Sequence, residues 1–186
     1  MSKIARNVSV WLYKQQAISK EDIELYEYGI LNVIIAIAPV LMVLVIGFFM
    51  HGMVEGMIML IPFLSIRKYS GGYHAPYMWV CTLTSCSLLM LCIYVILHSS
   101  WGYAYWGVLG IAMIILWNLS PIDSKNKRLT EKDKIKYRKI TRILLLIFLL
   151  IVVSFAVLSL TTEAKAVSMG IILTAVLQTP CVIKKL

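Results

Sequence analysis

Apolar residues occur along this chain in long runs, and polar residues gather in the short segments between them. The runs lie near Gly29 to Phe49, Met53 to Ile66, Tyr77 to Leu97, Tyr103 to Leu119, Ile143 to Leu160 and Ala166 to Ile183. A helix needs about 20 apolar residues to cross a bilayer, and lipid offers backbone polar groups no partners of its own. The pattern therefore predicts an all-α polytopic membrane protein with about six spanning or partly inserted helices.

Two of these runs leave the number of full crossings open. The run Met53 to Ile66 is short for a hydrocarbon core about 30 Å thick, and it contains Pro62. A tilted, paired or re-entrant helix would account for it equally well. The run Tyr103 to Leu119 is doubtful in the same way.

A different pattern occupies residues 1–28, where apolar and basic positions alternate at helical spacing. The apolar positions are Ile4, Val8, Trp11 and Leu12, and the polar ones around them are Lys3, Arg6, Asn7 and Lys14. Such a helix suits the surface of an anionic leaflet. We expect a cytoplasmic interfacial segment here, with a disordered basic tail as the alternative.

Composition agrees with a single membrane-embedded domain over residues 1–186. Of the 186 residues, 60% are hydrophobic and 15% are charged. The mean hydropathy is +0.84, more than one soluble core requires.

Lysine and arginine indicate the orientation, because short cytoplasmic loops carry excess positive charge. They concentrate near both termini and in the loops 67–76 and 120–142, whereas the opposite connections contain only Lys165. We therefore expect a multi-pass protein of the cell membrane with both termini and both loops in the cytoplasm. The net charge of +9 then suits binding to the anionic inner leaflet of the lipid bilayer or to an acidic partner. No nucleic-acid-binding module is visible in the sequence, so we expect no nucleic-acid partner. A homodimer is left open.

The segment from Arg67 to Cys81 carries the candidate chemistry. It reads R-K-Y-S-G-G-Y-H-A-P-Y-M-W-V-C and places a thiol where a cytoplasmic loop enters the third run. A cysteine attacks as its thiolate, and a nearby imidazole such as His74 can take its proton. Gly71 and Gly72 permit positive φ, so their N–H groups could receive an oxyanion. Arg67 could hold a carboxylate or clamp the loop.

Each of these residues also has an ordinary structural explanation. A lone cysteine in a membrane helix usually packs, a Gly-Gly pair usually turns, and Arg67 follows from the charge rule. Of the three other cysteines, Cys86 and Cys92 would share a helix with Cys81 and could not easily pair with it, so free thiols are expected. No spacing typical of a metal site occurs, and we expect neither a metal nor another cofactor.

Taken together, these residues resemble the accessory gene regulator B (AgrB) family, membrane cysteine endopeptidases of bacterial peptide quorum sensing. The family pattern has an arginine, a Gly-Gly pair, a histidine and, seven residues later, a cysteine. A second pattern follows the fourth apolar run and here reads Ser120, Pro121, Ile122, Asp123 and then Ser124 to Arg128. Where many relatives have proline next, this chain has Arg128 and Leu129, which weakens only the second pattern.

The resemblance implies a substrate and a reaction. The substrate would be a small AgrD-like precursor with an acidic C-terminal tail, and Cys81 would cut before that tail through a peptidyl thioester. Cyclisation would then release an autoinducing peptide. We expect the basic residues Lys125, Lys127 and Arg128 to attract the tail, with a plain solvated loop as the alternative. The candidates for a third, orienting residue are Asn118, Ser120 and Asp123.

Two other functions remain open from the sequence. A transporter or exporter of a peptide would need polar residues within its spans, and few are present. A non-catalytic membrane adaptor would need only the basic loop and the N-terminal helix.

Overall fold

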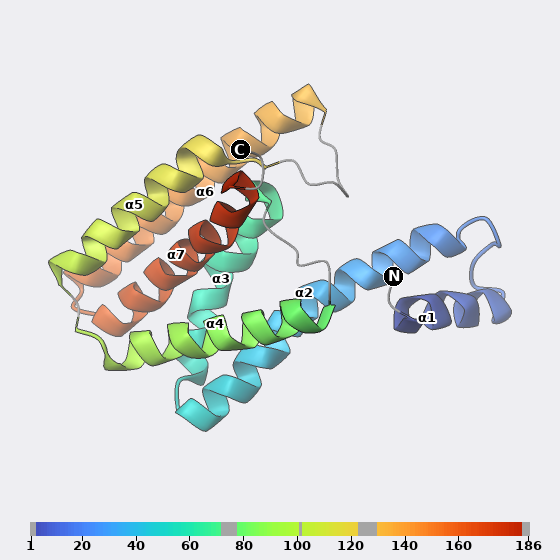
Figure 1. Ribbon diagram of the computed structural model, residues 1–186, viewed down its shortest axis with the longest axis horizontal. Coiled ribbons are helices and arrows are strands. Elements are labelled where there is room, and N and C mark those ends of the chain that lie inside the picture. The colour runs from blue at the N-terminus through green and yellow to red at the C-terminus, as the bar shows by residue number, and fades with distance from the viewer. Residues whose placement is uncertain (1–2, 72–77, 101, 123–129, 184–186) are drawn as a thin grey trace. The chain divides into compact units, whose positions relative to one another are not determined.

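The computed structural model describes residues 3–71, 78–100, 102–122 and 130–183, and all regular secondary structure in these ranges is helical (Figure 1). The helices are α1 (Lys3–Lys14), α2 (Ile23–Met50), α3 (Met53–Ser70), α4 (Met78–His98), α5 (Tyr103–Leu119), α6 (Glu131–Val157) and α7 (Thr161–Ile183). Each predicted apolar run corresponds to one of α2 to α7, and the predicted N-terminal helix corresponds to α1. The all-α prediction is thereby confirmed for the described residues.

The chain divides into two compact units, residues Met1–Leu41 and Met42–Leu186. In the first unit, α1 leaves Ile4, Val8 and Trp11 exposed along one stripe, while Ala5 and Ser9 are buried. These exposed positions follow the helical repeat, as they do on an amphipathic helix. The structure thus agrees with the predicted amphipathic helix.

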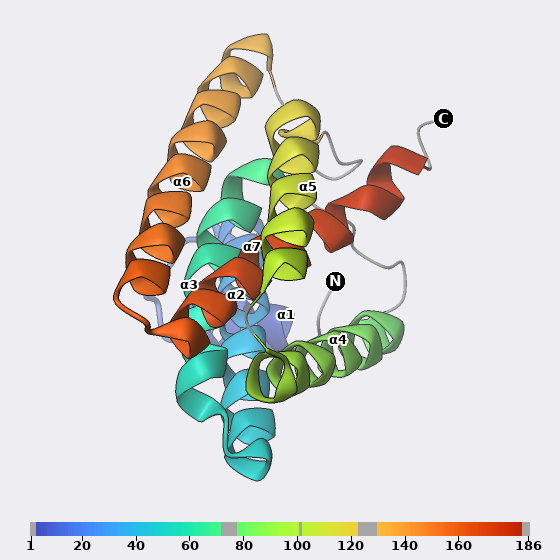
Figure 2. The same ribbon diagram turned by 90° about the vertical axis from the view of Figure 1, so that its left-hand side faces the viewer.

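In the second unit, α7 is the central helix and packs against α3, α4, α5 and α6. Figure 2 shows its ribbon crossing between α3 and α5. From Ala164 to Ala175 nearly every residue of α7 is buried, including Ala166, Val167, Ser168, Ile171 and Thr174. Because neighbouring helices surround α7, it needs fewer large apolar residues than a helix that faces lipid.

Among the described helices, α3 and α7 share the most extensive contact. A Cβ added to Gly170 would lie 2.3 Å from the carbonyl oxygen of Met59 and 2.6 Å from Cγ of Pro62. Small residues allow membrane helices to approach this closely and pack by van der Waals contact. Gly170 is therefore required by the geometry of the bundle core.

Large apolar side chains are exposed on the outer helices, for example Leu91, Ile111, Ile114 and Leu150. Among the described residues, α6 is the single helix long and apolar enough to cross a membrane, and shorter apolar stretches occur at Ile37–Met50, Leu83–His98 and Tyr103–Leu119. These features support a place in the membrane, and the number of crossings stays a prediction.

The connections of this unit gather at two opposite ends. At one end, which we call the motif end, hydrogen bonds join three residues: Ser70 is the last residue of α3, Ser120 directly follows α5, and Gln178 lies near the end of α7. At the other end, Nζ of the buried Lys165 on α7 donates to the carbonyl oxygen of Ser99 after α4, at 2.8 Å. Loops predicted to share one side of the membrane therefore share one end of the bundle.

Candidate functional site

The motif end begins where α3 stops. Gly71 has φ 77°, and its N–H donates to the carbonyl oxygen of Arg67 at 3.2 Å, which closes the last turn of α3. A Cβ at this position would lie 2.8 Å from the carbonyl oxygen of Ile122. A positive φ and a close backbone neighbour both favour glycine. This N–H is used in the last turn of α3, so the observed role of Gly71 is to shape the backbone, and its role as an oxyanion donor stays a prediction.

The second sequence pattern docks directly onto this turn. The N–H of Ile122 donates to the carbonyl oxygen of Ser70 at 3.0 Å. Ser70 and Ser120 are both buried, with exposed fractions of 0% and 2%. The structure thus brings together the starts of two segments that lie about fifty residues apart in the chain, and Asp123 follows outside the described residues.

Gln178 completes this cluster from α7. Its Nε2 donates to the carbonyl oxygen of Ser70 at 3.3 Å and to Oγ of Ser120 at 3.0 Å. The side chain is fully buried. Sequence reasoning missed this residue, although a glutamine inside an apolar run is a signal, because buried polar groups in such helices need partners.

Two other predicted site residues, Arg67 and Asn118, make described contacts on their own helices. The guanidinium of Arg67 is half-buried and lies 5.5 Å from the centre of the Phe63 ring. Nδ2 of Asn118 is exposed and donates to the carbonyl oxygen of Ile114, one turn back on α5, at 2.9 Å. Of the three candidates for an orienting residue, Ser120 is the one that the described contacts bring to the motif end.

Cys81 is the fourth residue of α4, in the first turn of that helix. The backbone is described at this position, while His74 and Gly72 lie outside the described residues. The positive end of a helix dipole favours a thiolate near this turn. Farther along α4, Cys86 is half-buried and Cys92 is buried, and both are free thiols. The pairing of Cys81 with His74 stays a prediction from the sequence.

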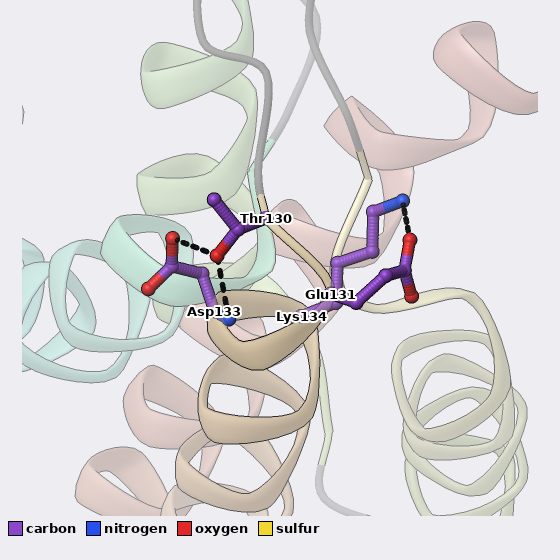
Figure 3. A network of polar contacts seen from close by, with 4 residues as sticks. All are labelled: Thr130, Glu131, Asp133 and Lys134. Carbon is purple, nitrogen blue, oxygen red and sulfur yellow. Dashed lines mark hydrogen bonds and ion pairs between the residues drawn. The ribbon is translucent and has the colours of Figure 1, made fainter.

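The basic segment leads into the first turn of α6, which is capped (Figure 3). Oγ1 of Thr130 accepts the N–H of Asp133 at 3.3 Å and donates to the carboxylate of the same residue at 2.7 Å. Nζ of Lys134 lies 2.8 Å from a carboxylate oxygen of Glu131. A threonine cap and acidic residues in the first turn stabilise a helix start. Three predicted tail-binding residues precede this cap outside the described residues: Lys125, Lys127 and Arg128.

Past the cap, α6 presents a basic and apolar surface. An open cavity of about 310 Å³ is lined by Ile135, Arg138, Lys139, Arg142, Ile143 and Leu146. Two aromatic contacts hold this part of α6 against its neighbours. The rings of Tyr137 and Tyr69 lie 5.7 Å apart at their centres, and the guanidinium of Arg142 lies 4.8 Å from the centre of the Trp117 ring. The start of α6 therefore lies beside the ends of α3 and α5, at the motif end.

Comparison with known proteins identifies the family. The sequence profile of the family described as Accessory gene regulator B matches residues 5–181. The chain belongs to the AgrB family. It is 30% identical over 138 residues to "AgrB-like protein 2" of Clostridium perfringens strain 13, and equally to an AgrB-like protein of strain SM101. No solved structure matches the chain.

These matches cover 69% of this chain and 64% of each relative, so the chain spans about two thirds of those proteins at most. The family confirms the resemblance seen in the two sequence patterns. AgrB membership supports a role in agr quorum sensing and association with the membrane.

Proposed function

We propose that this AgrB family member is a membrane cysteine endopeptidase that converts a small precursor peptide into a cyclic autoinducing peptide. The observation that carries the proposal is the place of Cys81. It lies in the first turn of α4, directly after the segment that contains His74. The AgrB profile matches residues 5–181, which include both residues. A thiol there has a helix start and an imidazole as neighbours in the sequence, and both favour the thiolate.

In the first half of the proposed reaction, His74 takes the proton of the Cys81 thiol. The thiolate attacks the carbonyl carbon of the amide that precedes the acidic tail. The imidazolium then gives its proton to the departing amine, the C–N bond breaks, and a peptidyl thioester remains on Sγ. Arg67, which lies one turn before Gly71, would steady the loop or meet a carboxylate of the substrate.

In the second half, a cysteine or serine side chain of the bound peptide attacks the thioester. Its proton passes to His74, the C–S bond breaks, and the Cys81 thiolate is regenerated as the thiolactone or lactone leaves. Water must be kept away until this attack occurs, because hydrolysis would release a linear peptide. A site where a loop enters an apolar helix bundle would help to exclude water, because apolar side chains surround it.

Recognition of the acidic tail is assigned to the basic surface at the motif end. Lys125, Lys127 and Arg128 would make the first electrostatic contact. The surface of α6 continues this charge through Arg138 and Arg142, with apolar side chains beside them. Complementary charges steer association more than they add affinity. We therefore assign these residues mainly to capture of the precursor.

The proposed topology places the motif end in the cytoplasm and the Lys165 end outside the cell, with several crossings and both termini inside. The positive-inside rule supports it. The meeting of the ends of α3, α5 and α7 with the start of α6 supports it further, because these connections must share one side.

The experiment that tests the activity is co-expression with an AgrD-like precursor that carries an acidic tail. Cys81→Ala and His74→Ala should each abolish tail removal, by orders of magnitude, while the protein still inserts. Cys86→Ala and Cys92→Ala are matched controls on the same helix and should process normally. Tail removal by Cys81→Ala at the wild-type rate would contradict the proposed function.

A further inference from the structure

Half of the residues that line the open cavity on α6 are cations: Arg138, Lys139 and Arg142. They follow one another at spacings of one, three and four residues, and positions three or four apart lie on the same face of a helix. Arg138 and Lys139 are exposed, whereas Arg142 is half-buried. The cavity therefore presents positive charge to whatever lies beside this part of α6.

These three cations have no carboxylate partner among the described residues. α6 has no acidic residue after Asp133, and the two carboxylates of its first turn are engaged at the cap, with Thr130 and Lys134. The acidic residues of α3 and α7 lie in the first turns of those helices, at the opposite end of the bundle. A concentrated positive potential attracts anions from outside the chain.

Arg142 is held in place by a neighbouring helix. Its guanidinium lies 4.8 Å from the centre of the Trp117 ring on α5, and its Nε is buried with no hydrogen-bond acceptor among the described residues. Arginine combines aromatic stacking with a planar set of donors, a geometry that suits phosphate. An aromatic ring and not a carboxylate orients this guanidinium, so its charge remains available to a ligand.

Beyond these cations the same face of α6 is apolar. Arg142 is the last charged residue of α6, and the cavity lining ends with Ile143 and Leu146, whose exposed fractions are 46% and 49%. The exposed Ile147 and Leu150 continue this apolar surface along a helix long enough to cross a membrane. Basic side chains at the edge of an apolar stretch lie at the depth of the lipid headgroups.

We propose that this cavity binds an anionic phospholipid: Arg138, Lys139 and Arg142 hold the phosphate, and an acyl chain lies along Ile143 and Leu146. Basic pockets between membrane helices bind such headgroups. A charged peptide tail would suit the cations but not the apolar surface that continues from them, whereas a phospholipid suits both. The proposal does not depend on peptidase activity. The cations shared with the surface assigned to capture of the precursor would meet a lipid and a peptide tail in turn.

The test measures lipid binding to the purified full-length protein by native mass spectrometry. The probes are dioleoylphosphatidylglycerol and dioleoylphosphatidylcholine, which have the same acyl chains but differ in net charge. Arg138→Gln combined with Lys139→Gln removes two exposed cations from the cavity. Lys132→Gln combined with Lys136→Gln is the matched control, because it removes the same charge from exposed positions of the same helix that do not line the cavity.

The first phosphatidylglycerol molecule should bind at least roughly tenfold more tightly than the first phosphatidylcholine molecule, because each basic residue beside an anionic headgroup contributes about fivefold in affinity. The Arg138 and Lys139 double variant should lose roughly tenfold or more of its affinity for phosphatidylglycerol and keep its affinity for phosphatidylcholine. The Lys132 and Lys136 control should stay within about twofold of the wild type for both lipids.

The binding of other anions separates a lipid site from a general anion site. Glycerophosphoglycerol, the same headgroup without acyl chains, and inorganic phosphate should displace the lipid no better than sodium chloride at equal ionic strength. Stronger displacement by either anion would overturn the assignment to a lipid.

Three further results would contradict the proposal. Equal affinity of the wild type for the two lipids would remove the preference for an anionic headgroup. Equal losses in the two double variants would leave only diffuse attraction between charges. Binding of an acidic peptide through Arg138 and Lys139, with the two lipids bound equally, would make this surface a peptide site.

Discussion

Replacing Gly170 with alanine tests the packing of α7, on which the motif end depends. The added Cβ would lie 2.3 Å from the carbonyl oxygen of Met59 and 2.6 Å from Cγ of Pro62. Ordinary contacts of this kind are about 3.5 Å, so α3 and α7 would have to separate by about 1 Å. Overpacking of this kind costs roughly 1–3 kcal/mol, and the better helix propensity of alanine offsets about 1 kcal/mol at most.

The expected net destabilisation is therefore about 1 kcal/mol, which corresponds to a decrease in Tm of about 2–4 °C for a domain of this size. The measurement is thermal unfolding of the detergent-solubilised protein, followed by loss of the monodisperse peak on size exclusion. Gly110→Ala is the matched control, because nothing lies within 4 Å of a Cβ added to Gly110 on α5. An unchanged Tm for Gly170→Ala would refute the tight crossing of α3 and α7.

Three further predictions follow from charge and burial. Lys165→Met should lower Tm by several degrees, because the carbonyl oxygen of Ser99 loses its donor and an unpaired buried group costs about 1–3 kcal/mol. An unchanged Tm would show that this hydrogen bond does not stabilise the fold. A cysteine in place of the exposed Lys68 should resist membrane-impermeant thiol reagents in intact cells, whereas one in place of Thr161 should react, and the reverse pattern would overturn the topology. Neutralising Lys125, Lys127 and Arg128 together should weaken precursor processing, whereas neutralising one should have little effect because a single exposed charge pair contributes only about 0.2–1 kcal/mol. Raised salt should weaken processing in the same way. Full activity of the triple variant at low precursor concentration would limit these residues to a role in topology.

Hydrophobic periodicity was sufficient to locate the helices but not all of their ends. α3 continues to Ser70, past the last apolar position at Ile66, because a helix can carry Arg67 and Lys68 beyond the apolar stretch. α6 begins at Glu131, twelve residues before the predicted apolar run at Ile143, since the cap at Thr130 stabilises a charged start. A run of apolar residues predicts the part of a helix that can lie in lipid. It does not predict the polar turns at the helix ends, because these depend on local capping.

The site was predictable in part, for a similar reason. Motif spacing selects Cys81 and His74 because their chemistry is local in the sequence. The contact of Ser70 with Ile122, and the amide of Gln178 that joins them, depend on which helices pack together. A single sequence reveals that Gln178 is polar within an apolar run, yet it does not reveal the partners of that amide. The central position of α7 had to come from the structure.

The most direct test of the peptidase proposal is to trap its covalent intermediate. A precursor whose cyclising residue is changed to alanine cannot resolve the thioester by cyclisation, so the wild-type protein should accumulate a peptidyl adduct that hydroxylamine releases. Mass spectrometry of the digested adduct should place the peptide on Cys81, and Cys81→Ser should accumulate no adduct of this kind. An adduct on Cys86, or tail removal with no hydroxylamine-sensitive adduct at any time, would contradict the mechanism.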